Sequence, residues 1–122
     1  MKSSDYERQY ELYDYDGLLF LTGELADKSI ADLHSFAATS EIRLFNIHAN
    51  TIEITYSGRD TNRWVVLWLK RLAQMMGNAS GQVTCTITTG DGDPLFEFFR
   101  IANGMLIRQR GHIVRHEPEP VS

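Results

Sequence analysis

Residues 82–115 read QVTCTITTGDGDPLFEFFRIANGMLIRQRGHIVR, and this stretch decides the fold. Residues 82–89 alternate apolar and polar side chains as a strand does, and residues 95–102 form a second, aromatic run. Asn103-Gly104 follows it directly. An Asn-Gly pair between two strand-like runs is the strongest short-range signal of a hairpin, because a type I′ turn needs positive φ at both positions. With a third strand over residues 105–115, this end of the chain is expected to form an antiparallel meander.

A long helix is predicted at about residues 62–76, with Asp60 or Thr61 able to cap its N-terminus and with Gly77-Asn78 and Ser80-Gly81 ending it. Its apolar residues recur at helical spacing and define the face that should pack on a sheet. These residues are Val65, Trp68, Leu69, Leu72, Met75 and Met76.

A shorter helix is predicted at about residues 29–38, where Ser29 followed three residues later by Asp32 resembles a capping box. Before it, residues 10–15 and 18–25 look like two strands joined at Asp16-Gly17, a second hairpin signal. After it, the alternation predicts two further strands, 42–49 and 51–57.

The expected class is therefore α+β, with one antiparallel sheet packed by a long and a short helix. Without the first strand and the last two, the elements follow the βαββαβ order of ferredoxin-like, or split βαβ, proteins. The rival arrangement is a strongly bent sheet around the long helix alone, with residues 27–38 as a loop or a helical turn. We expect one domain over residues 1–116 and a flexible tail over the proline-containing residues 117–122.

Charge is unevenly distributed in this chain of net charge −4. The first sixty residues carry eleven acids against five bases, whereas the rest carries five acids against seven bases. An acidic half is poorly suited to nucleic acid and well suited to a basic protein partner. We expect no membrane role, because no leader-like segment opens the chain and the longest apolar run, Trp64–Leu69, is far too short to span a bilayer.

Motifs for catalysis or cofactor binding are weak. Cys85 falls on the apolar phase of its strand, which indicates a buried, inert thiol. Asp91 and Asp93 lie in a Gly-Asp-Gly-Asp-Pro turn that lacks the longer ligand series of a calcium loop. His112 and His116 are spaced too widely on a strand to share one metal ion. The sequence thus predicts no metal site, no cofactor and no catalytic residue.

The basic residues of the C-terminal strands form a candidate anion site, in which Arg108, Arg110 and His112 share one phase and Arg100 lies on the partner strand. Such a cluster beside phenylalanines can clamp a phosphate or stack an RNA base. The alternative, which we favour, is a solvated face whose arginines pair with Glu97 or with the acidic half of the chain. On that interpretation Met105 and Ile107 belong to the core.

The functional hypothesis is a non-enzymatic protein-binding module of the cytoplasm, most concretely a bacterial immunity or antitoxin protein that neutralises a basic toxin or nuclease. Its predicted partner-binding residues are Tyr10, Tyr13, Asp14 and Asp16, which combine acidic charge with aromatic contact area. The alternative is a ferredoxin-like ligand-binding protein or enzyme, dimeric through its sheet, that uses Arg100, Arg108 or His112 on an anionic small molecule. A homodimer is compatible with either hypothesis.

Overall fold

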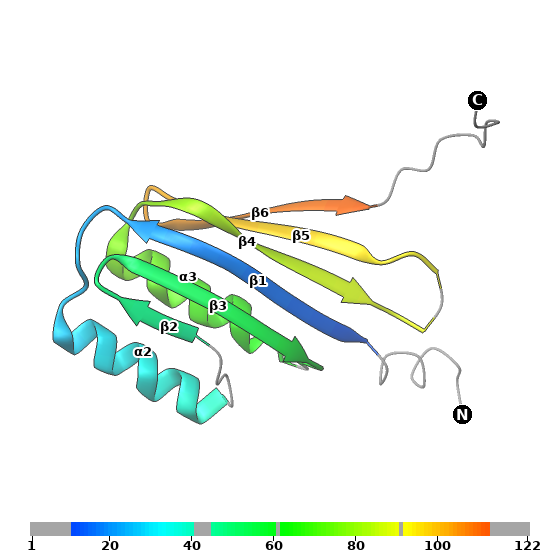
Figure 1. Ribbon diagram of the computed structural model, residues 1–122, viewed down its shortest axis with the longest axis horizontal. Helices are drawn as coiled ribbons and strands as arrows, with labels where there is room; N and C mark the ends of the chain where they lie inside the picture. Colours follow the sequence, from blue (N-terminus) through cyan, green and yellow to red (C-terminus); the bar gives the residue numbers. More distant parts are fainter. Residues whose placement is uncertain (1–10, 41–44, 61, 91, 113–122) are drawn as a thin grey trace.

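A computed structural model describes residues 11–40, 45–60, 62–90 and 92–112 (Figure 1). Six strands and two helices lie within these residues. In chain order they are β1 (Leu12–Leu21), α2 (Asp27–Ser40), β2 (Phe45–His48), β3 (Thr51–Gly58), α3 (Trp64–Met76), β4 (Ala79–Thr88), β5 (Leu95–Ala102) and β6 (Met105–His112).

The strands form one antiparallel sheet in the order β2-β3-β1-β4-β5-β6. β3 lies between β1 and β2, and β1 lies between β3 and β4, so each helical connection skips one strand, as in a split βαβ unit. Both helices lie on the same side of the sheet (Figure 1). One antiparallel sheet with two helices confirms the α+β class.

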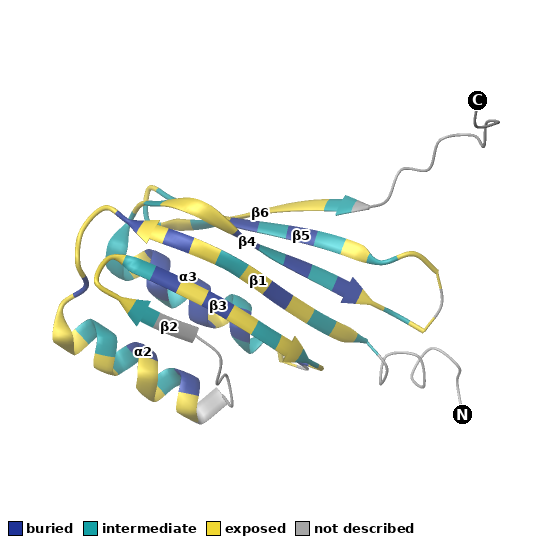
Figure 2. Cartoon of the chain, viewed as in Figure 1, coloured by how far each residue is buried: buried dark blue, intermediate teal, exposed yellow. Residues whose placement is uncertain are grey.

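We call the side of the sheet that faces the helices the inner face, and the other side the outer face. Because successive strand residues point to opposite sides, burial alternates along strands such as β3 and β5 (Figure 2). Ile52 and Ile54 of β3 are buried on the inner face, whereas Glu53 and Thr55 between them are exposed on the outer face. Among the described helices, none covers the outer face (Figure 1).

The core lies between the inner face and the apolar stripe of α3, as the helical spacing predicts. Trp68, Leu69 and Leu72 are at most 1% exposed. They belong to one buried cluster with inner-face residues of the sheet, which include Tyr15, Leu19, Ile52, Ile54, Val83, Cys85, Phe99 and Ile101.

The two helices are held together by polar contacts as well as by packing. The indole N–H of Trp68 donates to the carbonyl oxygen of Leu33 at 3.1 Å. The Arg71 guanidinium donates two hydrogen bonds to the Asp32 carboxylate, at 2.6 and 3.0 Å, and these lower the pKa of Asp32. Asp32 therefore links α2 to α3 and does not cap a helix, and the capping box predicted at Ser29 is wrong because α2 already begins at Asp27. Residues 27–38 are helical, which excludes the rival loop. The predicted difference between a long and a short helix is wrong: α2 has 14 residues and α3 has 13, because α2 extends two residues beyond its predicted range at each end.

Asp16-Gly17 is not a turn, contrary to the sequence prediction. These residues lie in the middle of β1, where Gly17 pairs with Ile54 on one side and Val83 on the other. A Cβ on Gly17 would lie 2.6 Å from the Val83 Cα, so glycine is needed here for close approach of two strands and not for positive φ. The alternation of Tyr15 and Leu19 continues unbroken through it, and the predicted strands 10–15 and 18–25 are one strand.

The boundaries of α3 follow from its neighbours. Arg63, immediately before it, has φ 52° and provides no side-chain cap, whereas the Asp60 carboxylate accepts from the Val65 N–H at 3.4 Å. At the other end the N–H of Gly77 donates to the Ala73 carbonyl oxygen at 2.9 Å, and Gly77 has φ 76°, a positive value that glycine adopts without steric cost. Ser80-Gly81 already belongs to β4.

The Asn103-Gly104 turn is confirmed, because both residues have positive φ, 54° and 73°, and β6 starts directly after them. This two-residue turn fixes the register, so that Phe99 pairs with Arg108 and Ile101 with Leu106. Phe99 and Ile101 face inward, and their β6 partners must therefore face inward too. The prediction of a buried Met105 and Ile107 is wrong: they are 63% and 38% exposed on the outer face.

Some predicted features lie outside the described residues and stay predictions: Tyr10 and the rest of 1–10, the start of the strand at 42–44, Thr61, Asp91, and residues 113–122 with His116 and the tail. Among the described residues, no helix combines the length and the apolar character that crossing a membrane requires.

Leu72→Ala tests the packing of α3. Because Leu72 is fully buried, its truncation should lower the free energy of unfolding by about 2 to 5 kcal/mol through loss of burial and cavity formation. Leu67→Ala is the matched control, since Leu67 lies in the same helix and is 40% exposed; it should cost less than about 1 kcal/mol. Denaturant titration of both variants measures this, and equal losses would mean that the buried face of α3 is assigned wrongly.

Candidate functional site

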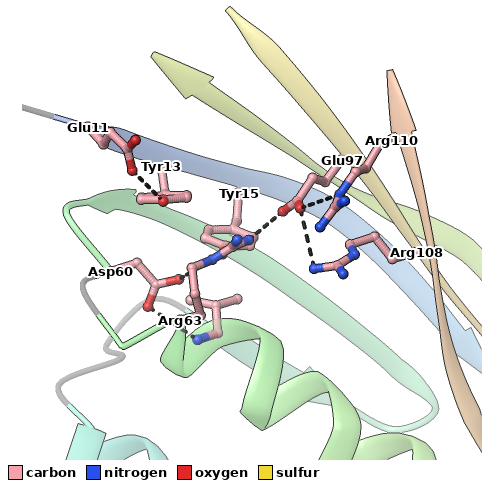
Figure 3. A network of polar contacts seen from close by, with 9 residues as sticks. Glu11, Tyr13, Tyr15, Asp60, Arg63, Glu97, Arg108 and Arg110 are labelled. Carbon is pink, nitrogen blue, oxygen red and sulfur yellow. Dashed lines mark hydrogen bonds and ion pairs between the residues drawn. The ribbon is translucent and has the colours of Figure 1, made fainter. Parts of the chain in front are cut away.

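A buried polar network lies where α3 begins against the inner face of the sheet (Figure 3). Its two acids, Asp60 and Glu97, are only 5% and 4% exposed. Arg63 lies between them and donates to the Glu97 carboxylate and, at 3.0 Å, to the Tyr15 hydroxyl. The Tyr15 hydroxyl in turn donates to Asp60 at 2.7 Å. One arginine thereby connects the loop before α3 with β1 and β5.

Two further arginines reach the same carboxylate from β6. Arg108 and Arg110 lie 3.5 and 3.8 Å from the Glu97 oxygen that Arg63 leaves free. The expected pairing of these arginines with Glu97 is therefore present. They lie on the inner face, and their side chains are also exposed, 41% for Arg108 and 72% for Arg110, because β6 lies at the edge of the sheet.

The sequence contains a signal for this network that the predicted sites do not include. Glu97 alternates with Phe99 and Ile101, which places a charge on the apolar phase of an otherwise buried strand. A charged residue in that position must find partners in the core. Which partners it finds depends on the approach of α3 and β6, and no local pattern predicts that.

Aromatic rings pack around the buried polar network. Tyr13 is half-buried, donates to Glu11 at 2.8 Å, and has the Arg63 guanidinium 4.6 Å above its ring. Tyr15 is fully buried between the rings of Tyr56 and Phe99. Tyr15 is therefore part of the core and does not reach the surface.

Burial and hydrogen bonding shift the pKa values of these groups and of Cys85. Burial raises the pKa of Tyr13 to about 12, and its hydrogen bond to Glu11 adds to this. Burial, and then the hydrogen bond to Asp60, raise the pKa of Tyr15 above its ordinary value. Burial alone would lower the pKa of Arg63, but its bonds to Glu97 and Tyr15 outweigh this and raise it. Burial also raises the pKa of Cys85 to about 12, so this thiol stays protonated at neutral pH and is a poor nucleophile.

The network has the character of a structural site. Among the described residues, no buried side-chain nitrogen or oxygen lacks a hydrogen-bond partner, and no group of three or more histidine, cysteine or acidic residues is placed to hold a metal ion. Asp60 and Arg63 have positive φ, 37° and 52°, a backbone geometry that persists only where surrounding contacts enforce it.

The predicted partner-binding residues are divided between the two faces. Asp14 and Asp16 are exposed on the outer face of β1, where the Ser57 hydroxyl donates to Asp14. Tyr13 lies on the inner face, and Tyr10 lies outside the described residues. Only the two aspartates therefore lie on one described surface.

The predicted anion-binding residues are divided in the same way. Arg108 and Arg110 are together on the inner face, and Arg100 is exposed on the outer face opposite Ile107. His112 ends β6, and its side chain lies outside the described part of the structure.

Beside the network, an open cleft of about 520 Å³ runs between α3 and β6. Its lining includes Lys70 of α3 and Arg108 of β6. Lys70 is not among the predicted site residues, because its place on the polar side of α3 indicates only a solvated helix face.

No protein-family model, curated protein or solved structure matches the chain.

Arg63→Leu tests the network. It removes the donor to one Glu97 oxygen and to the Tyr15 oxygen, and leaving these two buried atoms without that donor should lower the free energy of unfolding by about 1 to 3 kcal/mol. Arg59→Leu removes the same charge from an exposed position four residues earlier and should change it by about 0.5 kcal/mol or less. Equal effects of both variants in denaturant titration would contradict the network's structural role.

Alkaline pH should destabilise the fold. The raised pKa values of Tyr13 and Cys85, both about 12, exceed their ordinary values of 10.0 and 9.0, which the unfolded chain regains. Between these limits the folded protein retains protons that the unfolded chain releases, so the free energy of unfolding falls as pH rises. Denaturant titrations at about pH 8 and about pH 10.5 measure the fall, and Cys85→Val should reduce it. A free energy of unfolding that stays constant over this range would contradict the shifts.

Proposed function

We propose that this protein is a protein-binding module whose outer sheet face binds a basic protein partner. The observation that carries the proposal is that an entire face of a six-stranded sheet lies free of the described helices (Figure 1) while presenting large apolar side chains. Apolar side chains gathered on an uncovered surface are a common mark of an interaction site.

The apolar side chains of this face lie on β1 and on β5 and β6, with outward polar residues of β4 such as Gln82 and Thr84 between them. Leu18 and Phe20 of β1 are 42% and 45% exposed. The half-buried rings of Phe96 and Phe98 stack on β5 with centroids 6.4 Å apart, and Ile107 lies beside them on β6. Aromatic residues are enriched at the centres of protein interfaces because they give contact area at small entropic cost.

The charges of the face favour a basic partner. Asp14 and Asp16 on β1 and Glu53 on β3 point outward. In the described strands, Arg100 is the only lysine or arginine that points outward. Acidic side chains on the same face as apolar ones can steer a basic protein into contact, and burial of the apolar side chains can then hold it.

A hollow of about 330 Å³ lies beside Arg100 and Ile107, next to the Ser80-Gly81 end of β4. It offers a place for one apolar side chain of the partner. Anchoring residues of this kind supply most of the binding free energy in many complexes.

An acidic module of this kind fits an immunity or antitoxin protein that covers a basic toxin or nuclease in the bacterial cytoplasm. The raised pKa of Cys85 and the internal pairing of Asp60, Glu97 and Arg63 support a binding role over a catalytic one. A second copy of the same chain is the competing occupant of the face.

Matched baits test the proposal in extracts of the source cells. Wild-type protein, the double variant Asp16→Lys with Phe98→Ser, and the control Glu24→Lys are immobilised, and captured proteins are quantified. Glu24 is exposed in the loop after β1, off the sheet, so the control makes the same charge reversal elsewhere. We expect a basic protein that is retained by wild type and control and lost with the outer-face variant. Capture that is equal on all three baits, or loss of self-association alone, would contradict the proposal.

Binding kinetics of the isolated complex then test whether the acidic residues of the outer face steer association. Asp16→Lys should slow association with the captured partner by about tenfold at low salt, with a smaller effect on dissociation, and Glu24→Lys should leave both rates close to wild type. The difference should shrink at physiological ionic strength because exposed charges are screened. Thermal melts close to wild type would show that the fold is intact, and an unchanged association rate would exclude steering by this face.

A further inference from the structure

The cleft between α3 and β6 lies on the inner side of the sheet, away from the proposed protein-binding face. Val66 of α3, Phe99 of β5 and Leu106 of β6 give it apolar walls. Its volume of about 520 Å³ falls in the range of small-molecule sites. The cleft exists because β6 extends the sheet beyond the width that α3 covers.

Two cations face this apolar space from opposite walls. Lys70 lies one helical turn after Val66 on α3, and Arg108 lies on β6 next to Phe99. No acidic side chain is among the described residues that line the cleft. Lys70 forms no ion pair with another described residue, so its charge is available to a ligand.

Arg108 also keeps part of its charge for a ligand. Its nearest acid is Glu97 at 3.5 Å, and Glu97 is shared with Arg63 and Arg110. With Asp60 included, two carboxylates face three guanidinium groups, which leaves a positive surplus at this end of the cleft. An anion placed between Arg108 and Lys70 would balance it.

Contacts within the chain join the elements that form the two walls of the cleft. At one end the Gly104 N–H donates to the Gly77 carbonyl oxygen at 2.7 Å, and the Asn103 N–H donates to the Asn78 side chain at 3.0 Å. These bonds tie the β5–β6 turn to the end of α3. At the other end Glu97 holds Arg108. A site that is already formed loses less entropy when a ligand binds.

We propose that this cleft binds a small organic acid, with a carboxylate between Lys70 and Arg108 and an apolar body along Val66 and Leu106. Arg108 can donate two parallel hydrogen bonds to a carboxylate, and the ammonium of Lys70 adds a point charge from the facing wall. Arg100 takes no part, because it is exposed on the other face of the sheet.

Titration of isotope-labelled protein with octanoate tests this proposal, with amide chemical shifts as the readout. We expect shifts concentrated at Val66, Lys70, Leu106 and Arg108, and an affinity that falls as salt is added. Octanamide, which has the same chain without the charge, and inorganic phosphate, which has charge without an apolar body, should each bind about tenfold or more weakly. Shifts concentrated on the outer face, or octanamide binding as tightly as octanoate, would overturn the proposal.

Charge-removing variants locate the carboxylate. Lys70→Gln should weaken octanoate about threefold or more, and because Lys70 is exposed and outside the buried network, this variant should fold as wild type. Arg108→Gln should weaken it about tenfold.

The matched controls remove the same charges elsewhere. Lys28→Gln lies on α2 and Arg100→Gln on the outer face, and both should bind octanoate as wild type does. Wild-type affinity in Lys70→Gln, or an equal loss in Lys28→Gln and Lys70→Gln, would overturn the assignment. Because Asp16→Lys lies on the other face, it should leave octanoate binding unchanged, which separates failure of this proposal from failure of the protein-binding one.

Discussion

Two helices cannot cover a six-stranded sheet, and this constraint determines both candidate surfaces. Neighbouring strands lie about 4.8 Å apart, so the outermost strands of the sheet are about 24 Å apart, whereas one helix with its side chains is about 10 Å wide. Two helices side by side therefore cover most of one face and none of the other. The uncovered margin of the inner face at β6 becomes the cleft, and the outer face remains open to a partner.

Arg63 determines where α3 lies in this arrangement. It begins α3 from a left-handed backbone conformation and bonds to Tyr15 of β1 and Glu97 of β5. Buried charges of this kind cost free energy unless each is paired, so they add specificity of position more than stability. These bonds hold the start of α3 against β1 and β5. Glu97 also forms ion pairs with Arg108 and Arg110, so the same carboxylate connects β6 to the start of α3.

Features specified by neighbouring residues could be predicted from the sequence. The Asn103-Gly104 turn, β5 and the apolar stripe of α3 each depend on a few adjacent residues, and the structure confirms them. Asp16-Gly17 has the same local chemistry as a turn but lies in a strand, because pairing with β3 and β4 on both sides outweighs the turn preference. The sequence feature that distinguishes Asp16-Gly17 from the Asn103-Gly104 turn is the alternation of inward and outward side chains, which continues from Tyr15 through Gly17 to Leu19.

The candidate sites depend on distant residues, which is why the sequence predicted them only in part. The clustering of Arg108 and Arg110 follows from strand periodicity, but their side of the sheet follows from the register with β5. Lys70 joins Arg108 only because α3 lies beside β6. Likewise, Asp14 and Asp16 could be proposed as a binding surface from charge alone. The aromatic residues on the same face come from β5, which lies beyond β4 in the sheet and about eighty residues further along the chain.

Solvent accessibility of the outer face is the most decisive test of this arrangement. A soluble paramagnetic agent broadens NMR signals in proportion to their exposure, and it can be added to the free protein at low concentration. We expect strong broadening for the methyl groups of Leu18 and Ile107 on the outer face and little for those of Leu72 and Ile54 in the core. Outer-face methyl groups as protected as those of the core would mean that the face is already covered in the free protein, and would contradict an outer face open to a partner.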